Sequence, residues 1–217
     1  LLENEATKSY LGIDGMPGFG ERVRELLFGE DHEISTSRRA TTIQSPGGTG
    51  ALRVAGEFLA RAFPAARVWC SRPTWANHGA IFRAAGIEVA EYSYFDTASN
   101  GLDVSAFMED LAQIPPGDII CLHGCCHNPT GVDPSVEQWQ QVAEIVSERG
   151  LLPLVDFAYQ GFGDGLEADT VGLQTLARPG CQLLVASSFS KNFGLYRERV
   201  GALTVTTDDT DTAEVVL

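Results

Sequence analysis

The sequence is short of positive charge. It holds 15 Lys and Arg residues against 29 Asp and Glu residues, which gives a net charge of -14. Nucleic acids and anionic membranes bind to basic patches, so this balance argues against both as partners. No stretch is apolar enough to span a membrane. An anionic ligand would therefore depend on a few locally placed cations.

Paired cysteine motifs are also missing. The five cysteines are an odd number, and none shows the CxxC spacing. Cys125 and Cys126 are adjacent, whereas Cys70, Cys121 and Cys181 sit in apolar runs. This pattern predicts buried, reduced thiols in a cytoplasmic protein, in preference to a disulfide framework or a zinc site. We expect no metal.

An initiator methionine is absent as well. The chain begins at Leu1 and ends at Leu217 within an acidic and then apolar run, so we expect both ends to be cut. Whether a targeting peptide precedes Leu1 is left open. The 217 residues suffice for one large domain with its own core, and no internal repeat or linker divides them.

Apolar runs alternate with helical patterns along the chain. Leu52, Ala55, Leu59 and Ala62 recur at helical spacing after the glycines at 47–48. Asp133 followed by Pro134 predicts an N-cap and first turn, and Gly150 the end of that helix. Further helices are expected at 77–85 and 103–113, and strands at 67–70, 87–94, 118–123, 151–155, 183–186 and 200–205. This alternation predicts an α/β fold, a three-layer αβα domain with a mostly parallel sheet.

Polar and aromatic residues follow four of the expected strands. Ligands of parallel α/β sheets bind outside the carboxyl ends of the strands, so these residues form a candidate site. They are Trp75 after the first strand, His123 and Asn128 after the third, Asp156 and Tyr159 after the fourth, and Ser188 and Lys191 after the fifth.

The glycine-rich segment Gly47-Gly48-Thr49-Gly50 precedes an expected helix. Its amides and the positive end of the helix could hold a phosphate, with the Thr49 hydroxyl adding a bond. The alternative, which the segment taken alone favours, is a simple tight turn. It is neither a GxGxxG motif nor a P-loop, which argues against ATP and NAD.

Lys191 and Asp156 have possible chemical roles. Lys191 lies between Phe189 and Phe193, and a partly desolvated amine loses its proton more readily, as imine formation requires. Asp156 could pair with a pyridinium nitrogen and keep it protonated. Tyr159, three residues on, would point the same way in a helical turn. The ordinary alternatives are a solvated lysine and a turn aspartate.

Five motifs in order resemble the class I aminotransferases, the aspartate and aromatic amino acid enzymes of the bacterial type. They are residues 45–53 (SPGGTGALR), 73–78 (PTWANH), 123–131 (HGCCHNPTG), 156–161 (DFAYQG) and 187–201 (SSFSKNFGLYRERVG). The resemblance implies fold type I of the pyridoxal-phosphate-dependent transferases. It also implies that residues 1–217 are part of the large, cofactor-binding domain, without the N-terminal segment and the C-terminal small domain.

The resemblance implies a role for each candidate. Lys191 would hold pyridoxal 5'-phosphate as a Schiff base and shuttle a proton, with Asp156 at the pyridine nitrogen. Tyr159 and Asn128 would bind the ring oxygen, and Trp75 would stack on the ring. His123 would support the charge of Asp156. The phosphate would be held by Gly47, Gly48, Thr49, Ser188 and Arg199, and by Tyr10 from the neighbouring subunit of a homodimer.

The chain departs from the family pattern at two positions. Gly47 stands where some members carry a serine, so one phosphate hydroxyl is absent, and Arg197 stands where Asn is common. The arginines that bind substrate carboxylates lie outside the chain. We therefore expect residues 1–217 alone to be inactive, and the choice between aspartate and aromatic substrates stays open.

The expected function is transamination between an L-amino acid, aspartate or aromatic, and a 2-oxo acid such as 2-oxoglutarate. The alternative is a catalytically inactive module that binds pyridoxal phosphate as a sensor.

Overall fold

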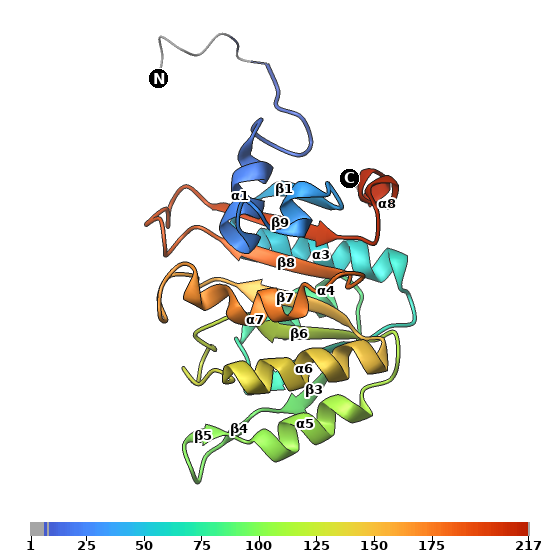
Figure 1. Cartoon of the computed structure of the whole chain (residues 1–217), viewed down its shortest axis with the longest axis vertical. Coiled ribbons are helices and arrows are strands. Elements are labelled where there is room, and N and C mark those ends of the chain that lie inside the picture. The colour runs from blue at the N-terminus through green and yellow to red at the C-terminus, as the bar shows by residue number, and fades with distance from the viewer. Residues whose placement is uncertain (1–6, 8, 217) are drawn as a thin grey trace.

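A seven-stranded sheet forms the centre of the molecule in a computed structural model, which describes residue 7 and residues 9–216 (Figure 1). The strand order is β1-β9-β8-β7-β6-β2-β3. The strands are β1 (Ala40–Pro46), β2 (Val68–Arg72), β3 (Val89–Ser93), β6 (Ile119–His123), β7 (Leu152–Phe157), β8 (Leu183–Ser188) and β9 (Val200–Thr206). The pairs from β3 to β8 are parallel, and β9 runs antiparallel to both neighbours. The predicted mostly parallel sheet is confirmed.

Helices cover both faces of this sheet. Figure 1 shows α5 and α6 in front of the sheet and α3 behind it. The longer helices are α1 (Phe19–Phe28), α3 (Gly47–Ala62), α4 (Asn77–Ala84), α5 (Val104–Gln113) and α6 (Val136–Arg149). Short helices are α2 (Glu33–Thr36), α7 (Val171–Leu176) and α8 (Thr210–Val216), with a 3-10 turn at Ala168–Thr170. Strands β4 (Phe95–Asp96) and β5 (Gly101–Leu102) form a separate small hairpin.

Alternate residues of the central strands enter two separate cores. In β6, Ile120 and Leu122 pack on the side of α1, α5, α6 and α7, whereas Ile119 and Cys121 pack on the side of α3 and α4. This two-residue period is the geometry of a strand buried on both faces. The three-layer αβα architecture is therefore confirmed.

Two local predictions were wrong. The N-cap of α6 is Ser135 and not Asp133, because Ser135 and Gln138 form a reciprocal capping box. Asp133 instead accepts hydrogen bonds from the amides of Cys126 and His127 at 2.6 and 2.8 Å. Tyr159 does not lie in a helical turn, because the chain leaves β7 into an irregular loop.

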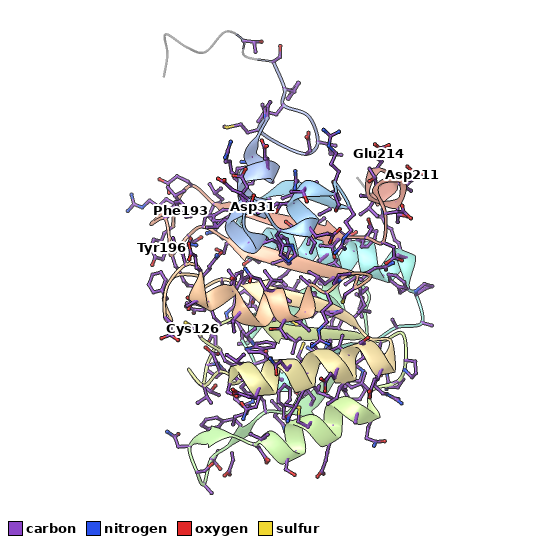
Figure 2. All side chains as sticks on the ribbon, in the orientation of Figure 1. Asp31, Cys126, Phe193, Tyr196, Asp211 and Glu214 are labelled. Atoms are coloured by element: carbon purple, nitrogen blue, oxygen red, sulfur yellow. The ribbon has the colours of Figure 1, made fainter. Side chains whose placement is uncertain are left out.

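The carboxyl ends of the parallel strands lie at one edge of the sheet. Figure 2 shows Phe193, Tyr196 and Cys126 along this edge. The loops that carry them follow β8 and β6, so residues far apart in sequence meet there. Among the described residues, no helix is both long enough and apolar enough to cross a membrane.

Candidate active site

A cavity of about 260 Å³ opens at the carboxyl ends of β6, β7 and β8. It is lined by ten of the twelve predicted site residues, namely Gly48, Thr49, Trp75, His123, Asn128, Asp156, Tyr159, Ser188, Lys191 and Arg199. Larger hollows of about 440 and 400 Å³ lie beside β1 and at the opposite edge of the sheet. Among the residues that line them there is no lysine, so the smaller cavity holds the chemically distinctive groups.

Lys191 reaches the cavity from the loop after β8. Its Nζ lies 3.8 Å from the centre of the Tyr159 ring. The predicted aromatic surroundings are only partly present: Phe189 is buried, whereas Phe193 is 58% exposed. The ring of Phe189 also packs edge-on against Phe19 of α1, which fixes the start of this loop. The amine is therefore held against an aromatic face while the cavity side remains open.

Asp156 ends in the cavity with one oxygen already engaged. Its Oδ2 lies 2.9 Å from Nε2 of His78, and Nδ1 of His78 lies 2.8 Å from the Thr74 hydroxyl. An ionised carboxylate only accepts, so a neutral His78 carries its proton on Nε2 and accepts from Thr74. Asp156 is 7% exposed. This arrangement holds a carboxylate in place, and its second oxygen has no hydrogen-bond partner among the described residues.

The hydrogen bond to Asp156 comes from His78 and not from His123, although a nitrogen of His123 lies within 4.8 Å of both groups. That His123 supports the charge of Asp156 stays a prediction. His123 sits 5.2 Å from the His78 ring and lines the cavity, and both of its ring nitrogens are buried without a hydrogen-bond partner in the described structure. Burial is the main cause that lowers the pKa of His123 to about 4. The ring is therefore neutral at physiological pH, and its two buried nitrogens are left unsatisfied by the described residues.

The amino end of α3 forms another wall. Gly47 and Gly48 belong to the first turn of this helix, and no side chain of the described residues caps it. Its first amides therefore lack intrahelical and side-chain partners, which is the arrangement that binds anions. Gly47 has φ 75°, and a Cβ there would lie 2.5 Å from Nη2 of Arg199. The missing side chain lets the Arg199 guanidinium approach the helix end.

Arg199 and Ser188 add polar groups at the same place. Arg199 has φ 56°, and its Nη1 donates to Ser190 Oγ at 3.1 Å and to the Tyr196 carbonyl at 3.3 Å. A Cβ on Gly48 would lie 3.0 Å from Cβ of Ser188, so β8 and α3 are in close contact. A cation, a hydroxyl and free amides thus converge on a site suited to a phosphate.

Tyr10 is the one predicted site residue that lies away from the cavity. It is fully exposed, on the segment that extends from α1 away from the sheet (Figure 1). Gly47 does not line the cavity directly, but contacts Arg199 as described. Sequence reasoning missed Ser190 and Tyr196, which also line the cavity. It also missed the contact of His78 with Asp156. The available signal was that His78 lies three residues after Trp75, which was itself a candidate.

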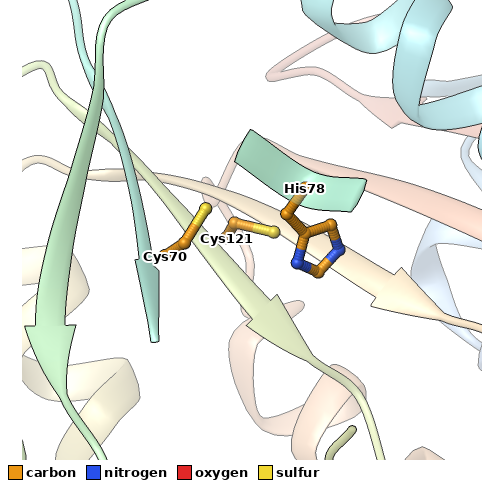
Figure 3. A group of neighbouring side chains, drawn as sticks. All are labelled: Cys70, His78 and Cys121. Carbon is orange, nitrogen blue, oxygen red and sulfur yellow. The ribbon is translucent and has the colours of Figure 1, made fainter. Parts of the chain in front are cut away.

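Two thiols lie beneath His78. The sulfur atoms of Cys70 and Cys121 and a nitrogen of His78 lie within 4.8 Å of one another (Figure 3). Both nitrogens of His78 are already hydrogen-bonded, so a metal ion here would have to displace Thr74 or Asp156. The thiols pack in the α3 and α4 core. All five cysteines of the chain are free, and Cys126 and Cys181 are only half-buried, contrary to the expectation that all would be buried.

Comparison with known proteins agrees with this geometry. The family described as aminotransferase class I and II matches residues 1–216. The chain belongs to the class I and II aminotransferase family. An aspartate aminotransferase of Salmonella typhi is 55% identical over 214 residues, covering 99% of this chain and 54% of that protein. An aromatic-amino-acid aminotransferase of Pseudomonas aeruginosa is 51% identical over 205 residues, covering 94% and 51% respectively.

A solved aminotransferase structure has the same fold. It is the aromatic-amino-acid aminotransferase of Burkholderia pseudomallei covalently bound to pyridoxal phosphate, with a TM-score of 0.96 and 45% identity. It covers all of this chain, which spans 54% of that structure. The predicted aminotransferase fold is thereby confirmed. The chain spans about half the length of the curated aminotransferases that it matches.

Proposed function

We propose that the cavity binds pyridoxal 5'-phosphate and that the protein moves an amino group between an L-amino acid and a 2-oxo acid. The observation that carries the proposal is the convergence of Lys191, Asp156 and the uncapped end of α3 on one cavity. These groups match an aldehyde, a pyridine nitrogen and a phosphate, three of the polar parts of that cofactor. His123 also lines this cavity.

Each part of the cofactor has candidate partners in the chain. Lys191 would bind the aldehyde and Asp156 the ring nitrogen, with Asn128 and Tyr159 at the ring oxygen. Trp75 would lie against the ring. The phosphate would contact Gly48, Thr49, Ser188 and Arg199. Because Gly47 has no side chain, it would let the Arg199 guanidinium lie close to the end of α3.

The bound cofactor supplies an electron sink for bonds at the substrate α-carbon. The chain's own residues provide the rest. Asp156, held by His78, keeps a ring nitrogen protonated. Lys191 would take and return the proton at the α-carbon. Trp75 and Leu52, which line the cavity, exclude water from one side.

The proposal extends to the larger protein. We propose that the described residues are its cofactor-binding domain and that aspartate or an aromatic amino acid is the donor, with 2-oxoglutarate as a suitable acceptor. The names of the relatives support both donor classes equally. We further propose a homodimer, in which the exposed Tyr10 reaches the neighbouring subunit's phosphate, and a cytoplasmic location, which the free cysteines favour.

The chain's two lysines, Lys8 and Lys191, make a direct test possible. The full-length protein is loaded with pyridoxal phosphate and reduced with borohydride, and the labelled peptide is identified by mass spectrometry. We expect the label on Lys191, and loss of both label and transaminase turnover in Lys191→Ala. Lys8→Ala is the matched control and should behave as wild type. Normal turnover of Lys191→Ala would overturn the proposal, and labelling without turnover would favour the sensor alternative.

A further inference from the structure

His127 lies next to Asn128 but does not line the cavity. Its side chain is held on three sides. Nε2 lies 2.8 Å from the hydroxyl of Ser71 in β2, and Nδ1 lies 2.8 Å from the hydroxyl of Thr130. The ring stacks on Tyr94 at 3.9 Å with an interplanar angle of 14°. His127 is 2% exposed, so the ring is buried and has both nitrogens satisfied.

The same residue organises the loop that follows β6. Its amide donates to Asp133 at 2.8 Å, and its carbonyl accepts from the amide of Gly131 at 2.6 Å. Thr130 also accepts from the amide of Val132 at 3.2 Å. The loop from 126 to 132 is thus tied to β2 through the imidazole ring of His127. It is tied to Tyr94 through that ring and through the Tyr94 hydroxyl, which donates to the Val132 carbonyl at 2.7 Å.

Asn128 depends on this loop for its position. Within the described part of the chain, no hydrogen bond fixes the Asn128 side chain, although it lines the cavity. Its direction is set by the backbone on either side, and His127 is the adjacent anchor. A displacement of about 1 Å in such a group is enough to weaken a catalytic or binding contact substantially.

His127 is unsuited to a direct chemical role. Burial is the main cause that lowers the pKa of His127 to about 3, so the ring is neutral at physiological pH. Both nitrogens already face hydroxyl groups, which can each donate or accept. The one N–H of the neutral ring is therefore already directed at a hydroxyl, and the ring packs against both Tyr94 and His123.

We propose that His127 is a positioning residue, which through Ser71, Thr130 and Tyr94 fixes the loop that aims the Asn128 amide at the cofactor's ring oxygen. This inference rests on the proposed function. A donor at that oxygen stabilises its deprotonated form and so lowers the pKa at which the bound cofactor titrates. If His127 acts through Asn128, removing either residue raises that pKa, and removing both adds nothing more.

The test is a double-mutant cycle on the pH titration of the bound cofactor's visible absorption. His127→Phe keeps a ring to stack on Tyr94 and removes both hydrogen bonds. We expect His127→Phe and Asn128→Ala each to raise the cofactor pKa by about one unit, and the double variant to match Asn128→Ala. We also expect kcat/KM to fall about tenfold in each single variant. Additive effects in the double variant would overturn the inference.

Milder variants keep the test decisive should His127→Phe fail to fold. Ser71→Ala removes one hydrogen bond to the ring, whereas Thr130→Val removes the other and also the bond from the amide of Val132. Each should raise the cofactor pKa by a smaller amount. Thr42→Val is the matched control, because it removes a buried hydroxyl contact of 3.0 Å to Thr204, in β1 and β9. Lower melting temperatures without a change of cofactor pKa would show a purely structural role. Absence of a cofactor band in the wild type would instead contradict the proposed function itself.

Discussion

The contact between His78 and Asp156 is the one on which the proposed chemistry most depends. His78 has no exposed surface, and it is the only side chain that the described structure shows hydrogen-bonded to this carboxylate. We expect His78→Asn to lower kcat/KM about 10- to 100-fold, as is common when the partner of a functional group is removed. Steady-state kinetics on the full-length protein measures this.

A distant histidine provides the control for that prediction. His32→Asn changes a residue that caps the short helix α2 through a 3.1 Å bond to the amide of Ile34. It should leave kcat/KM close to the wild-type value. Equal effects of the two substitutions would show that His78 has no special relation to Asp156.

His123 should make the stability of the cofactor-free protein depend on pH. Burial lowers its pKa from 6.5 to about 4, so the unfolded chain binds this proton at a higher pH than the folded one. The contribution of neutral His123 to the free energy of unfolding is fully present above pH 6.5 and is lost as the pH falls towards 4. At pH 5 the loss amounts to about 2 kcal/mol. Urea unfolding at pH 7 and pH 5 measures this loss of free energy of unfolding. In His123→Asn the difference between the two pH values should be correspondingly smaller. If the substitution leaves the pH dependence unchanged, the loss does not come from His123.

Among the secondary-structure elements, helix α6 begins with a hydroxyl side chain and an acidic side chain that have different roles. Ser135 caps the helix, whereas Asp133 binds the amides of Cys126 and His127. We expect Ser135→Ala to lower the free energy of unfolding by about 1 kcal/mol and leave cofactor affinity unchanged. Asp133→Ala should weaken cofactor binding, because it releases the loop that carries Asn128. Urea unfolding and cofactor titration together test this, and the reverse pattern would restore Asp133 as the cap.

The sequence predicted this helix but not its cap, for a physical reason. Asp133-Pro134 is a good helix start in isolation, but the reciprocal bonds of Ser135 and Gln138 satisfy two backbone groups at once. Strand β1 and helix α1 were also missed. Thr41, Thr42 and Gln44 give β1 little apolar character, and its place in the sheet comes from pairing with β9, more than 150 residues away.

The amino end of α3 is sensitive to a single added atom. A Cβ at Gly47 would meet Arg199 at 2.5 Å, and the φ of 75° disfavours any other residue. We expect Gly47→Ala to displace Arg199 and to raise the dissociation constant of pyridoxal phosphate about tenfold or more. Gly29→Ala is the control, since Gly29 also has positive φ but open space around its Cβ position. Both variants should unfold more easily than the wild type, but only Gly47→Ala should bind pyridoxal phosphate more weakly. Equal affinities of the two variants would show that Gly47 and Arg199 are not part of the phosphate site.

At the scale of the whole molecule, the sheet topology explains why the site was largely predictable. Each candidate after β2, β6, β7 and β8 was placed by the rule that parallel strands end at one edge, and the cavity gathers them there. Contacts between loops were not predictable in this way. The choice of His78 over His123 as the hydrogen-bond partner of Asp156 depends on how α4 packs against α3, β2 and β3, which no local pattern encodes.

Tyr10 can be assigned only at the level of the assembly. It is fully exposed and lies outside the cavity of its own chain, so a role at the phosphate requires a second subunit. We expect the full-length protein to sediment as a dimer, and Tyr10→Phe to weaken cofactor binding several-fold, the loss of one hydrogen bond to a charged group. The dimer itself should persist in this variant.

Hybrid dimers decide whether Tyr10 acts across the interface. A subunit with Tyr10→Phe is paired with a subunit that carries Lys191→Ala, and the hybrids are isolated with two different affinity tags. If Tyr10 serves the neighbouring subunit, the site that retains Lys191 receives an intact tyrosine from the partner. Such hybrids should bind cofactor at that site with wild-type affinity and show about half the wild-type turnover, since only one of two sites works. If Tyr10 serves its own subunit, the only site with Lys191 has lost its tyrosine, and the hybrid should show the weakened affinity of Tyr10→Phe.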